Sequence, residues 1–268
     1  MHRLARRHTR LLRGHAVRVS SPQGRFADAA LVDGHVFRRA EAWGKHLFHE
    51  YDNDLSVHVH LGIYGEFHER APGVEPKDTT RMRIVSADGE AGGMTSRVLL
   101  DLIGPTTCEV VDAAGRDAIV ARIGPDPLRR DADPERAWER LRRRKGPIGP
   151  ALLDQGLFAG VGNVFRAEAL FVHGIHPETP IPSITREQFD ALWATLTRML
   201  QTGVKEGRIM TVDHEEVGVR SRRHLTRENG RYVYRQESCL RCGAPVRRWD
   251  MAGRWSYACE ICQPRPPS

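Results

Sequence analysis

Four cysteines in the last thirty residues place the tightest constraint on how this chain can fold. They form two C-x2-C pairs with sixteen residues between them: Cys239, Cys242, Cys259 and Cys262. Each pair can supply two thiolates from one tight turn, so together they complete a tetrahedral zinc site with no open position. Because so small a unit has little core of its own, the metal would stabilise it. The pattern predicts a structural zinc ribbon, with a disulfide pair or idle thiols as the alternatives.

The residues between the two cysteine pairs suit a short hairpin. Ala252-Gly253 provides a turn between two stretches of strand-forming residues, which are Val246, Trp249, Trp255 and Tyr257. The fifth cysteine, Cys108, lies outside this pattern. Thiols arranged for a metal suit a reducing compartment better than secretion, so we expect a cytoplasmic protein.

The chain is basic, with a net charge of +7 and a pI of about 9.5. Arginine gathers in two clusters, within 129–145 and 220–254. Such a balance suggests a polyanionic partner, most simply nucleic acid; a solvated face or arginine-rich codon usage is the alternative. The sequence has no apolar run of about eighteen residues and no apolar segment behind its basic N-terminus, so neither a membrane span nor a signal peptide is predicted.

The first half of the chain has the pattern of a β-protein behind one helix. Residues 2–13 predict a short helix that ends at Gly14. From 16 to 123, short runs alternate apolar with polar residues and are separated by turn residues, which indicates a sandwich or barrel. Gly124-Pro125-Asp126-Pro127 then breaks the pattern and predicts a link to a second domain.

The chain beyond this link is predicted to be helical. Asp133 can cap a helix that begins at Pro134. Thr185-x-x-Gln188 is a capping-box pattern that opens a helix over 186–202. Residues 208–230 are charged and lack periodicity, which predicts a mobile loop before the ribbon.

A turn with two glycines, Gly160-Val161-Gly162-Asn163, precedes a helical stretch over 163–173. The glycines permit close backbone approach, and a helix N-terminus offers N–H groups and a positive dipole end to an anion such as phosphate. Asn163 can cap the helix or donate to the phosphate. A purely structural turn with an asparagine cap is the alternative.

Residues 152–171, LLDQGLFAGVGNVFRAEALF, resemble the helix–two-turn–helix of the formamidopyrimidine-DNA glycosylase / endonuclease VIII family. In that family the element grips phosphates beside a damaged nucleotide, and Asn163 matches the phosphate-binding asparagine. The ribbon is similar too, because Tyr232-Val233-Tyr234-Arg235 leads into Cys239 as in the family's finger. Arg254 matches the fingertip arginine, which contacts phosphate and is assigned a role in δ-elimination.

Two motifs in the first half extend the resemblance. Trp43-Gly44-Lys45-His46-Leu47-Phe48 resembles the strand that carries the family's lysine, which binds phosphate and is assigned as the proton donor in β-elimination; Lys45 takes that position. His60-Leu61-Gly62-Ile63-Tyr64-Gly65 matches a DNA-contacting hairpin whose apolar residue fills the space left by a flipped base. The match makes Ile63 the wedge and Tyr64 its neighbour. Without it, Lys45 would be interpreted as a solvated charge and Ile63 as a core residue.

Two departures favour the endonuclease VIII-like branch of the family. Gly149 stands where the formamidopyrimidine enzyme has a DNA-contacting lysine. The arginine–phenylalanine void-filling loop of that enzyme is not evident around Asp101-Leu102-Ile103-Gly104. The resemblance therefore implies oxidised pyrimidines, rather than purine lesions, as substrates.

A third departure concerns the start of the chain. The family begins Pro-Glu-Gly: the proline amine attacks the deoxyribose C1′ to form a Schiff base, and the glutamate protonates the sugar. An α-amino group with a pKa near ~8 is partly unprotonated at neutral pH, which suits a nucleophile. Met1-His2-Arg3 aligns about six residues further in, a gap of up to ~20 Å if extended. We expect little activity without the two missing groups; an internal start, a deliberate truncation or a natural inactive form would explain the gap.

The sequence thus predicts an α+β, multidomain protein: an N-terminal β-sandwich with a leading helix (1–123), a helix–two-turn–helix domain with its mobile loop (124–231) and a zinc-ribbon finger (232–268). The resemblance implies a monomeric bifunctional DNA glycosylase and AP lyase of base-excision repair, acting on damaged double- or single-stranded DNA at the bacterial nucleoid. The alternatives are a non-catalytic damaged-DNA or single-stranded-DNA-binding protein, and a zinc-ribbon protein of the transcription or translation machinery.

Overall fold

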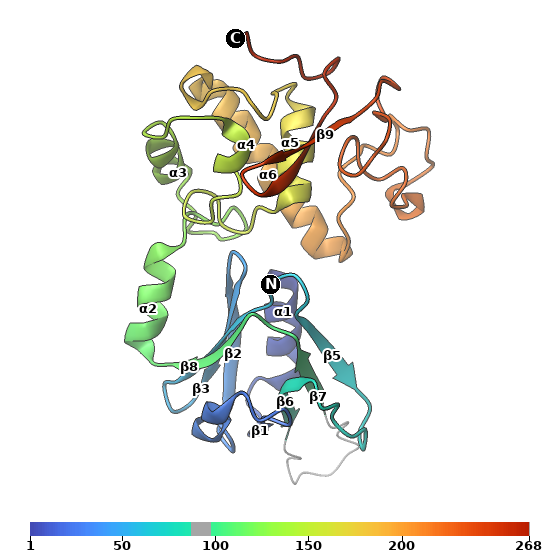
Figure 1. Cartoon of the computed structure of the whole chain (residues 1–268). Helices are drawn as coiled ribbons and strands as arrows, with labels where there is room; N and C mark the ends of the chain where they lie inside the picture. The colour runs from blue at the N-terminus through green and yellow to red at the C-terminus, as the bar shows by residue number, and fades with distance from the viewer. Residues whose placement is uncertain (87–97, 268) are drawn as a thin grey trace. The chain divides into compact units, whose positions relative to one another are not determined.

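The computed structural model describes residues 1–86 and 98–267, which fall into two compact units, Met1–Arg122 and Ile123–Ser268 (Figure 1). The first unit is a β-sandwich behind a leading helix, α1 (His2–Leu12). The chain leaves α1 through Gly14, whose φ of 82° is costly for any residue with a side chain. Leu12 of α1 is fully buried in the sandwich core, so the helix belongs to this unit's packing.

Two antiparallel four-stranded sheets make up the sandwich, as the strand pattern predicted. The first sheet has the order β1 (Val17–Ser20), β6 (Thr80–Ser86), β7 (Leu99–Ile103), β5 (Glu66–Arg70). The second has the order β2 (Phe37–Trp43), β3 (His46–Tyr51), β4 (Ser56–His60), β8 (Thr107–Val111). Both sheets contribute fully buried side chains to one apolar core, among them Ile84, Phe37 and Val57. Two shorter elements complete the unit: η1 (Ala27–Leu31) and α2 (Ala113–Arg122).

The second unit begins with the helices α3 (Pro134–Leu141), α4 (Ile148–Ala151), α5 (Asn163–Val172) and α6 (Arg186–Glu206), with η2 (Ile181–Ser183) before α6. The sequence predicted the starts of three of them, α3, α5 and α6. The Asp133 side chain accepts the Arg136 N–H and caps α3. Thr185 and Gln188 form both bonds of the capping box that opens α6. These helices pack around a core that includes Phe158, Phe189 and Leu196.

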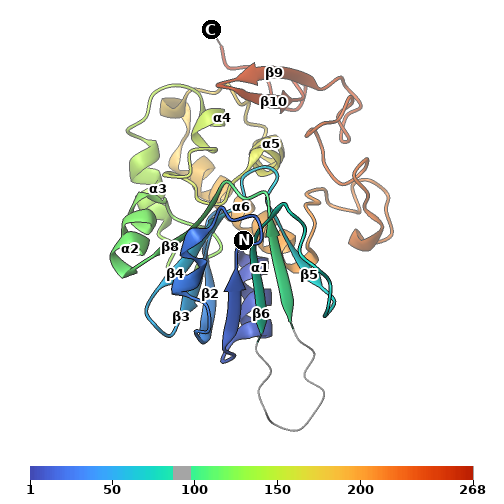
Figure 2. The ribbon, with the colours of Figure 1, turned by 60° about the horizontal axis from the view of Figure 1, so that its bottom comes forward.

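The C-terminal ribbon is a two-stranded hairpin of β9 (Arg247–Met251) and β10 (Arg254–Ala258), shown in Figure 2. Ala252 and Gly253 join the strands, and both have positive φ, at 54° and 75°. Two consecutive residues with positive φ fit the turn of a two-residue hairpin, so the predicted turn is confirmed. Tyr257 packs into an apolar cluster that also holds Phe171 of α5, so the ribbon rests on this helix.

The segment 208–230 joins α6 to the ribbon. Within it, one short element, η3 (Arg222–His224), is assigned, and the rest is irregular. Val212 and Leu225 are nevertheless buried. The irregularity agrees with the sequence, whereas the mobility of this segment stays a prediction. Within the described residues, no helix is both long and apolar enough to cross a membrane.

Candidate nucleic-acid interface and metal centre

The four cysteines of the ribbon converge on one point. Their four Sγ atoms lie within 4.8 Å of one another. The Sγ atoms of Cys239 and Cys262 are 4.0 Å apart, and those of Cys242 and Cys259 are 3.4 Å apart. A tetrahedral zinc ion with Zn–S bonds of about 2.3 Å requires S···S separations of about 3.8 Å. The geometry therefore fits a closed four-sulfur metal site, which would serve structure and leave no position for a catalytic water.

The fifth cysteine takes no part in this cluster. Cys108 lies on β8 in the other unit. Burial raises the pKa of its thiol to about 12, so the thiolate form that binds metals is disfavoured.

The N-terminus of α5 contradicts one of the two roles predicted for Asn163, which were to cap the helix or to donate to a phosphate. Gly162, with extended backbone angles, is the N-cap, and Asn163 is the first helical residue. The prediction that Asn163 caps the helix is therefore wrong. Its Nδ2 instead donates to the carbonyl oxygen of Trp255 at 2.9 Å, because the ribbon lies against this end of the helix. The helix end still offers first-turn N–H groups and the positive dipole end that favour an anion.

This contact brings two predicted phosphate-binding residues to one place. Asn163 bonds to the residue that directly follows Arg254 in β10, across 92 positions of sequence. Arg254 itself is exposed beside the hairpin turn. Trp255 is 51% exposed, and the Arg248 guanidinium lies 4.5 Å from the centre of its ring. An exposed arginine, an amide and a helix N-terminus thus form a surface suited to a polyanion.

A buried arginine, which the sequence did not reveal, completes this junction. Arg166 of α5 is fully buried, and its Nη2 donates to the same Trp255 carbonyl at 2.7 Å. The available signal was a basic residue three positions after Asn163 within a mainly apolar run, in which Glu168 is the other charged residue.

Lys45 lies in the two-residue turn between β2 and β3, not within a strand as predicted. Trp43 and His46 are the last paired residues of the ladder, and Gly44 in the turn has a φ of 57°. Lys45 is half-buried there. Burial lowers the pKa of His60, and the charges of His58 and Lys45 act in the same direction, so Lys45 and His60 share one end of the second sheet.

Ile63 and Tyr64 project from the turn between β4 and β5. Their side chains are 75% and 84% exposed, so the interpretation of Ile63 as a core residue is wrong. Gly62 has a φ of 68°, and a Cβ on it would lie 1.9 Å from the Thr106 hydroxyl oxygen. The turn therefore packs closely against Thr106 and presents the side chains of Ile63 and Tyr64 to solvent.

A hydrogen-bonded histidine chain runs beside Lys45 and was not predicted. His46 Nδ1 lies 2.8 Å from His58 Nε2, and His58 Nδ1 lies 2.8 Å from Glu109 Oε1. A carboxylate only accepts, so His58 donates from Nδ1, and a neutral His58 then accepts from His46. Burial lowers the pKa of His46 to about 4, and His58, His60 and Arg122 add to this. The chain orients the first residue of β3, directly after Lys45.

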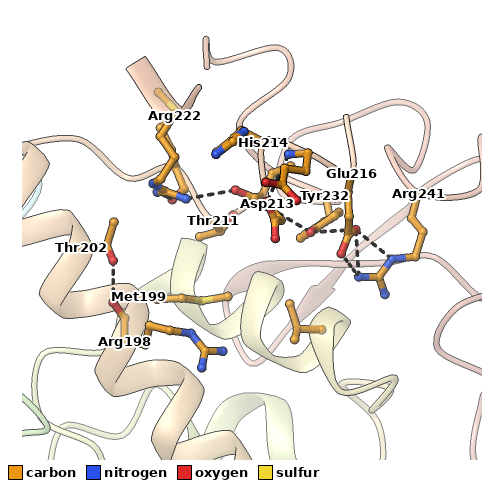
Figure 3. Close-up of a pocket in the computed structure, with 14 residues that line it drawn as sticks. Arg198, Met199, Thr202, Thr211, Asp213, His214, Glu216, Arg222, Tyr232 and Arg241 are labelled. Carbon is orange, nitrogen blue, oxygen red and sulfur yellow. Dashed lines mark hydrogen bonds and ion pairs between the residues drawn. The ribbon is translucent and has the colours of Figure 1, made fainter. Parts of the chain in front are cut away.

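A cavity of about 580 Å³ lies elsewhere in the second unit (Figure 3). The helix α6, the end of α5 and the residues around 210–216 line it, together with Arg241 of the ribbon. Glu216 accepts from the Tyr232 hydroxyl at 2.9 Å and pairs with Arg241 at 3.2 Å, as Figure 3 shows. Because these lining charges already satisfy one another, we assign the cavity no ligand.

Both units have known relatives. Residues 2–96 match the formamidopyrimidine-DNA glycosylase N-terminal domain, and residues 123–214 match the formamidopyrimidine-DNA glycosylase H2TH domain. The chain is 45% identical to Endonuclease 8 1 of Mycobacterium tuberculosis, over 98% of this chain and 97% of that protein. It is 30% identical to formamidopyrimidine-DNA glycosylase of Thermomicrobium roseum, over 88% of this chain and 84% of that protein.

The same fold occurs in solved structures. A complex of Lactococcus lactis Fpg with DNA that contains an abasic site has a TM-score of 0.78 and 22% identity, with 98% of each chain covered. A complex of that species' enzyme with DNA containing FAPY-dG has a TM-score of 0.77 at the same identity and coverage. At this identity the likeness establishes the fold, including the β-sandwich and the helical domain.

Proposed function

Since this chain belongs to the formamidopyrimidine-DNA glycosylase / endonuclease VIII family of base-excision-repair DNA glycosylases, we propose that it is a bifunctional glycosylase and AP lyase that removes oxidised pyrimidines. The observation that carries the proposal is the junction at α5. There Asn163, at a helix N-terminus, bonds to the backbone carbonyl of Trp255, the residue that follows the exposed Arg254. Few surfaces suit a DNA phosphate better, because the amide, the guanidinium and the dipole all favour negative charge.

We propose that exposed and half-buried residues of both units contact the DNA, with different roles. Asn163, Arg254 and Lys45 would hold phosphates, and such contacts fix position without reading sequence. Ile63 would fill the space left by the extruded base, with Tyr64 and His60 beside it. Extrusion is required because the sugar carbon under attack is inaccessible within a stacked duplex. The exposure of Ile63 and Tyr64 supports this role, since a wedge must be free to enter the stack.

The proposed chemistry follows the family's scheme. In that scheme an N-terminal proline amine attacks C1′ while the bond between C1′ and the damaged base breaks and the base leaves; the adjacent glutamate protonates the sugar, the ring opens, and a Schiff base results. Lys45 then assists β-elimination and Arg254 assists δ-elimination. The four cysteines would hold one structural zinc ion, which would fix the ribbon that carries Arg254.

Two features support pyrimidine rather than purine lesions. A Cβ on Gly149 would lie 2.9 Å from both Met251 Sδ and the Pro177 carbonyl oxygen, so a lysine at this position would not fit without rearrangement. Asp101 is buried within β7 and paired with Arg83 at 2.7 Å, so this stretch is a strand and not a void-filling loop. The higher identity to an Endonuclease 8 than to the T. roseum formamidopyrimidine enzyme agrees.

Borohydride trapping on an abasic strand tests the proposal. The 268-residue chain begins Met1-His2-Arg3, so it is compared with a version extended at its start by a short segment that begins Pro-Glu-Gly. A control with one further residue ahead of the proline lacks the secondary amine. We expect trapping by the extended version alone, with release of oxidised thymine faster than of oxidised guanine. Equal trapping by the 268-residue chain would assign the nucleophile elsewhere, with Lys45 the first candidate.

The other outcomes separate the alternatives. If the extended version binds abasic DNA but is never trapped, the protein is a non-catalytic damaged-DNA-binding module. Binding without preference for duplex damage over intact or single-stranded DNA would contradict the repair function altogether. A zinc-ribbon role in transcription or translation loses support, because the Endonuclease 8 match covers 98% of the chain. We further propose that the protein acts as a monomer on cytoplasmic, nucleoid DNA, which sedimentation and cell imaging can check.

A further inference from the structure

Helix α5 carries two fully buried side chains of opposite charge, Arg166 and Glu168. Residues two apart point to different sides of a helix, so the two do not neutralise each other. Glu168 accepts the backbone N–H groups of 232, 233 and 234 at 2.7–2.9 Å. Arg166 donates to the Trp255 carbonyl in β10. Through Glu168, α5 therefore binds the start of the ribbon, and through Arg166 it binds strand β10.

The Arg166 guanidinium is bonded at a single point. Its Nε and Nη1 atoms are buried without a hydrogen-bond partner, and no ion pair joins it to a carboxylate in the described part of the chain. Burying a charge without an ion-pair partner destabilises the folded protein unless other interactions offset the desolvation cost. An apolar side chain would fill the same space and make the protein more stable. The hydrogen bond to the Trp255 carbonyl therefore accounts for an arginine at this position.

That bond acts at the junction already described. The Trp255 carbonyl oxygen has two lone pairs, and the Asn163 amide and Arg166 occupy both. Asn163 is partly exposed, whereas Arg166 is sealed from solvent. When a phosphate draws the amide toward itself, Arg166 still holds the carbonyl. The strand stays fixed at the residue next to Arg254.

We propose that Arg166 is a positioning residue, which fixes β10 against α5 and thereby places Arg254 for the second elimination step. This inference rests on the proposed function and adds to it a residue that never touches DNA. Burial lowers the pKa of Arg166 to about 10, with Arg254 acting in the same direction, and the group stays cationic at neutral pH. Its charge therefore also supports an anion at the junction.

The test is the ratio of δ- to β-elimination products on an abasic oligonucleotide, measured with the Pro-Glu-Gly-extended chain. Arg166→Met keeps the side-chain length and removes every donor. We expect it to lower the δ-to-β ratio about tenfold, as a small misplacement of a catalytic group does. Schiff-base trapping should change by less than about twofold, because the nucleophile lies at the other end of the chain. Arg166→Lys, which keeps the charge and an N–H donor group, should restore most of the ratio.

A matched control comes from the same unit. Arg208 also donates to a backbone carbonyl at 2.7 Å, that of Leu225, away from the hairpin. Arg208→Met should leave the product ratio unchanged. A wild-type ratio in folded, zinc-loaded Arg166→Met would overturn the proposal, and so would an equal slowing of trapping and of both eliminations. If the methionine variant does not fold, Arg166→Leu, which also lacks a donor, is judged by the same criteria.

Amide hydrogen exchange tests the anchoring role of Arg166 independently of the proposed function. Arg166→Met or Arg166→Leu should speed exchange in 254–258 and leave α6 unchanged. If the unsubstituted protein neither traps nor cleaves abasic DNA, the proposed function fails while this measurement still decides the anchoring role. Unchanged exchange in 254–258 would refute that role.

Discussion

Replacing Glu168 by glutamine should detach the start of the ribbon from α5. The carboxylate accepts three backbone N–H groups and the Thr211 hydroxyl, two bonds on each oxygen: Oε2 accepts from Thr211 and the Tyr232 N–H, and Oε1 accepts from the N–H groups of 233 and 234. Glutamine keeps one acceptor oxygen and turns an NH2 group toward two donors. Each buried donor left without a partner costs about 1–3 kcal/mol, so the change should destabilise the second unit by about 4 kcal/mol.

Burial and hydrogen bonding act in opposite directions on this group. Burial raises the pKa of Glu168, and the hydrogen bonds from Thr211 and the backbone of 232–234 counter it. The three backbone N–H groups can only donate, so their bonds favour the carboxylate form. The predicted destabilisation by Glu168→Gln therefore comes from the loss of charge-assisted hydrogen bonds as well as from the changed side-chain group.

Urea unfolding followed by zinc release and by exchange of the 232–234 amides measures the effect. Glu139→Gln is the matched control, since Glu139 is a surface residue paired with Arg142 on α3 and should show no measurable change. A Glu168→Gln protein that loses less than about 1 kcal/mol, with exchange at 232–234 as slow as in wild type, would refute the anchoring argument.

Three further predictions concern the wedge turn, acidity and the metal site. Gly62→Ala should weaken binding to abasic DNA about tenfold by displacing the wedge turn, whereas Gly73→Ala, with a similar φ of 82° and open space around it, should not affect binding in the same gel-shift assay. Burial lowers the pKa of His8 to about 4, so the stability this neutral group contributes is present above pH 6.5 and is lost as pH falls toward 4; urea unfolding of the first unit should show about 2 kcal/mol lost between pH 6.5 and 5. Chelation or Cys259→Ser should abolish zinc retention and DNA binding together, while Cys108→Ser should retain both, as metal analysis and gel shift will show.

Local signals explain what could be predicted from the sequence. The cysteine spacing, the capping box of α6 and the hairpin turn at Ala252-Gly253 each depend on residues a few positions apart, and each has the expected geometry. The exposed turn that carries Ile63 and Tyr64 could not be derived this way. Only its resemblance to a family separated Ile63 from the apolar strand residues that normally enter a core.

The junction at α5 was beyond such signals because its bonds join distant segments. The prediction that Asn163 caps its own helix followed a sound local preference, but the ribbon supplies an acceptor 92 positions away. A cap bond and a tertiary bond of similar length differ little in free energy, so the packing of the ribbon decides between them. The turn position of Lys45 likewise depends on the register between β2 and β3, which the pattern of apolar residues did not specify.

Helix α5 suggests how such junctions can be recognised. Residues 165–171 are all buried, so the helix has no solvent face on which a charge could rest. A charged side chain on a helix buried all round must find a partner on another segment, because its desolvation is otherwise uncompensated. Arg166 and Glu168 therefore mark the two places where the ribbon docks. The buried charges locate the interface more directly than the apolar residues around them. An apolar side chain can pack against any apolar neighbour, whereas a buried charged side chain needs a specific hydrogen-bonding partner.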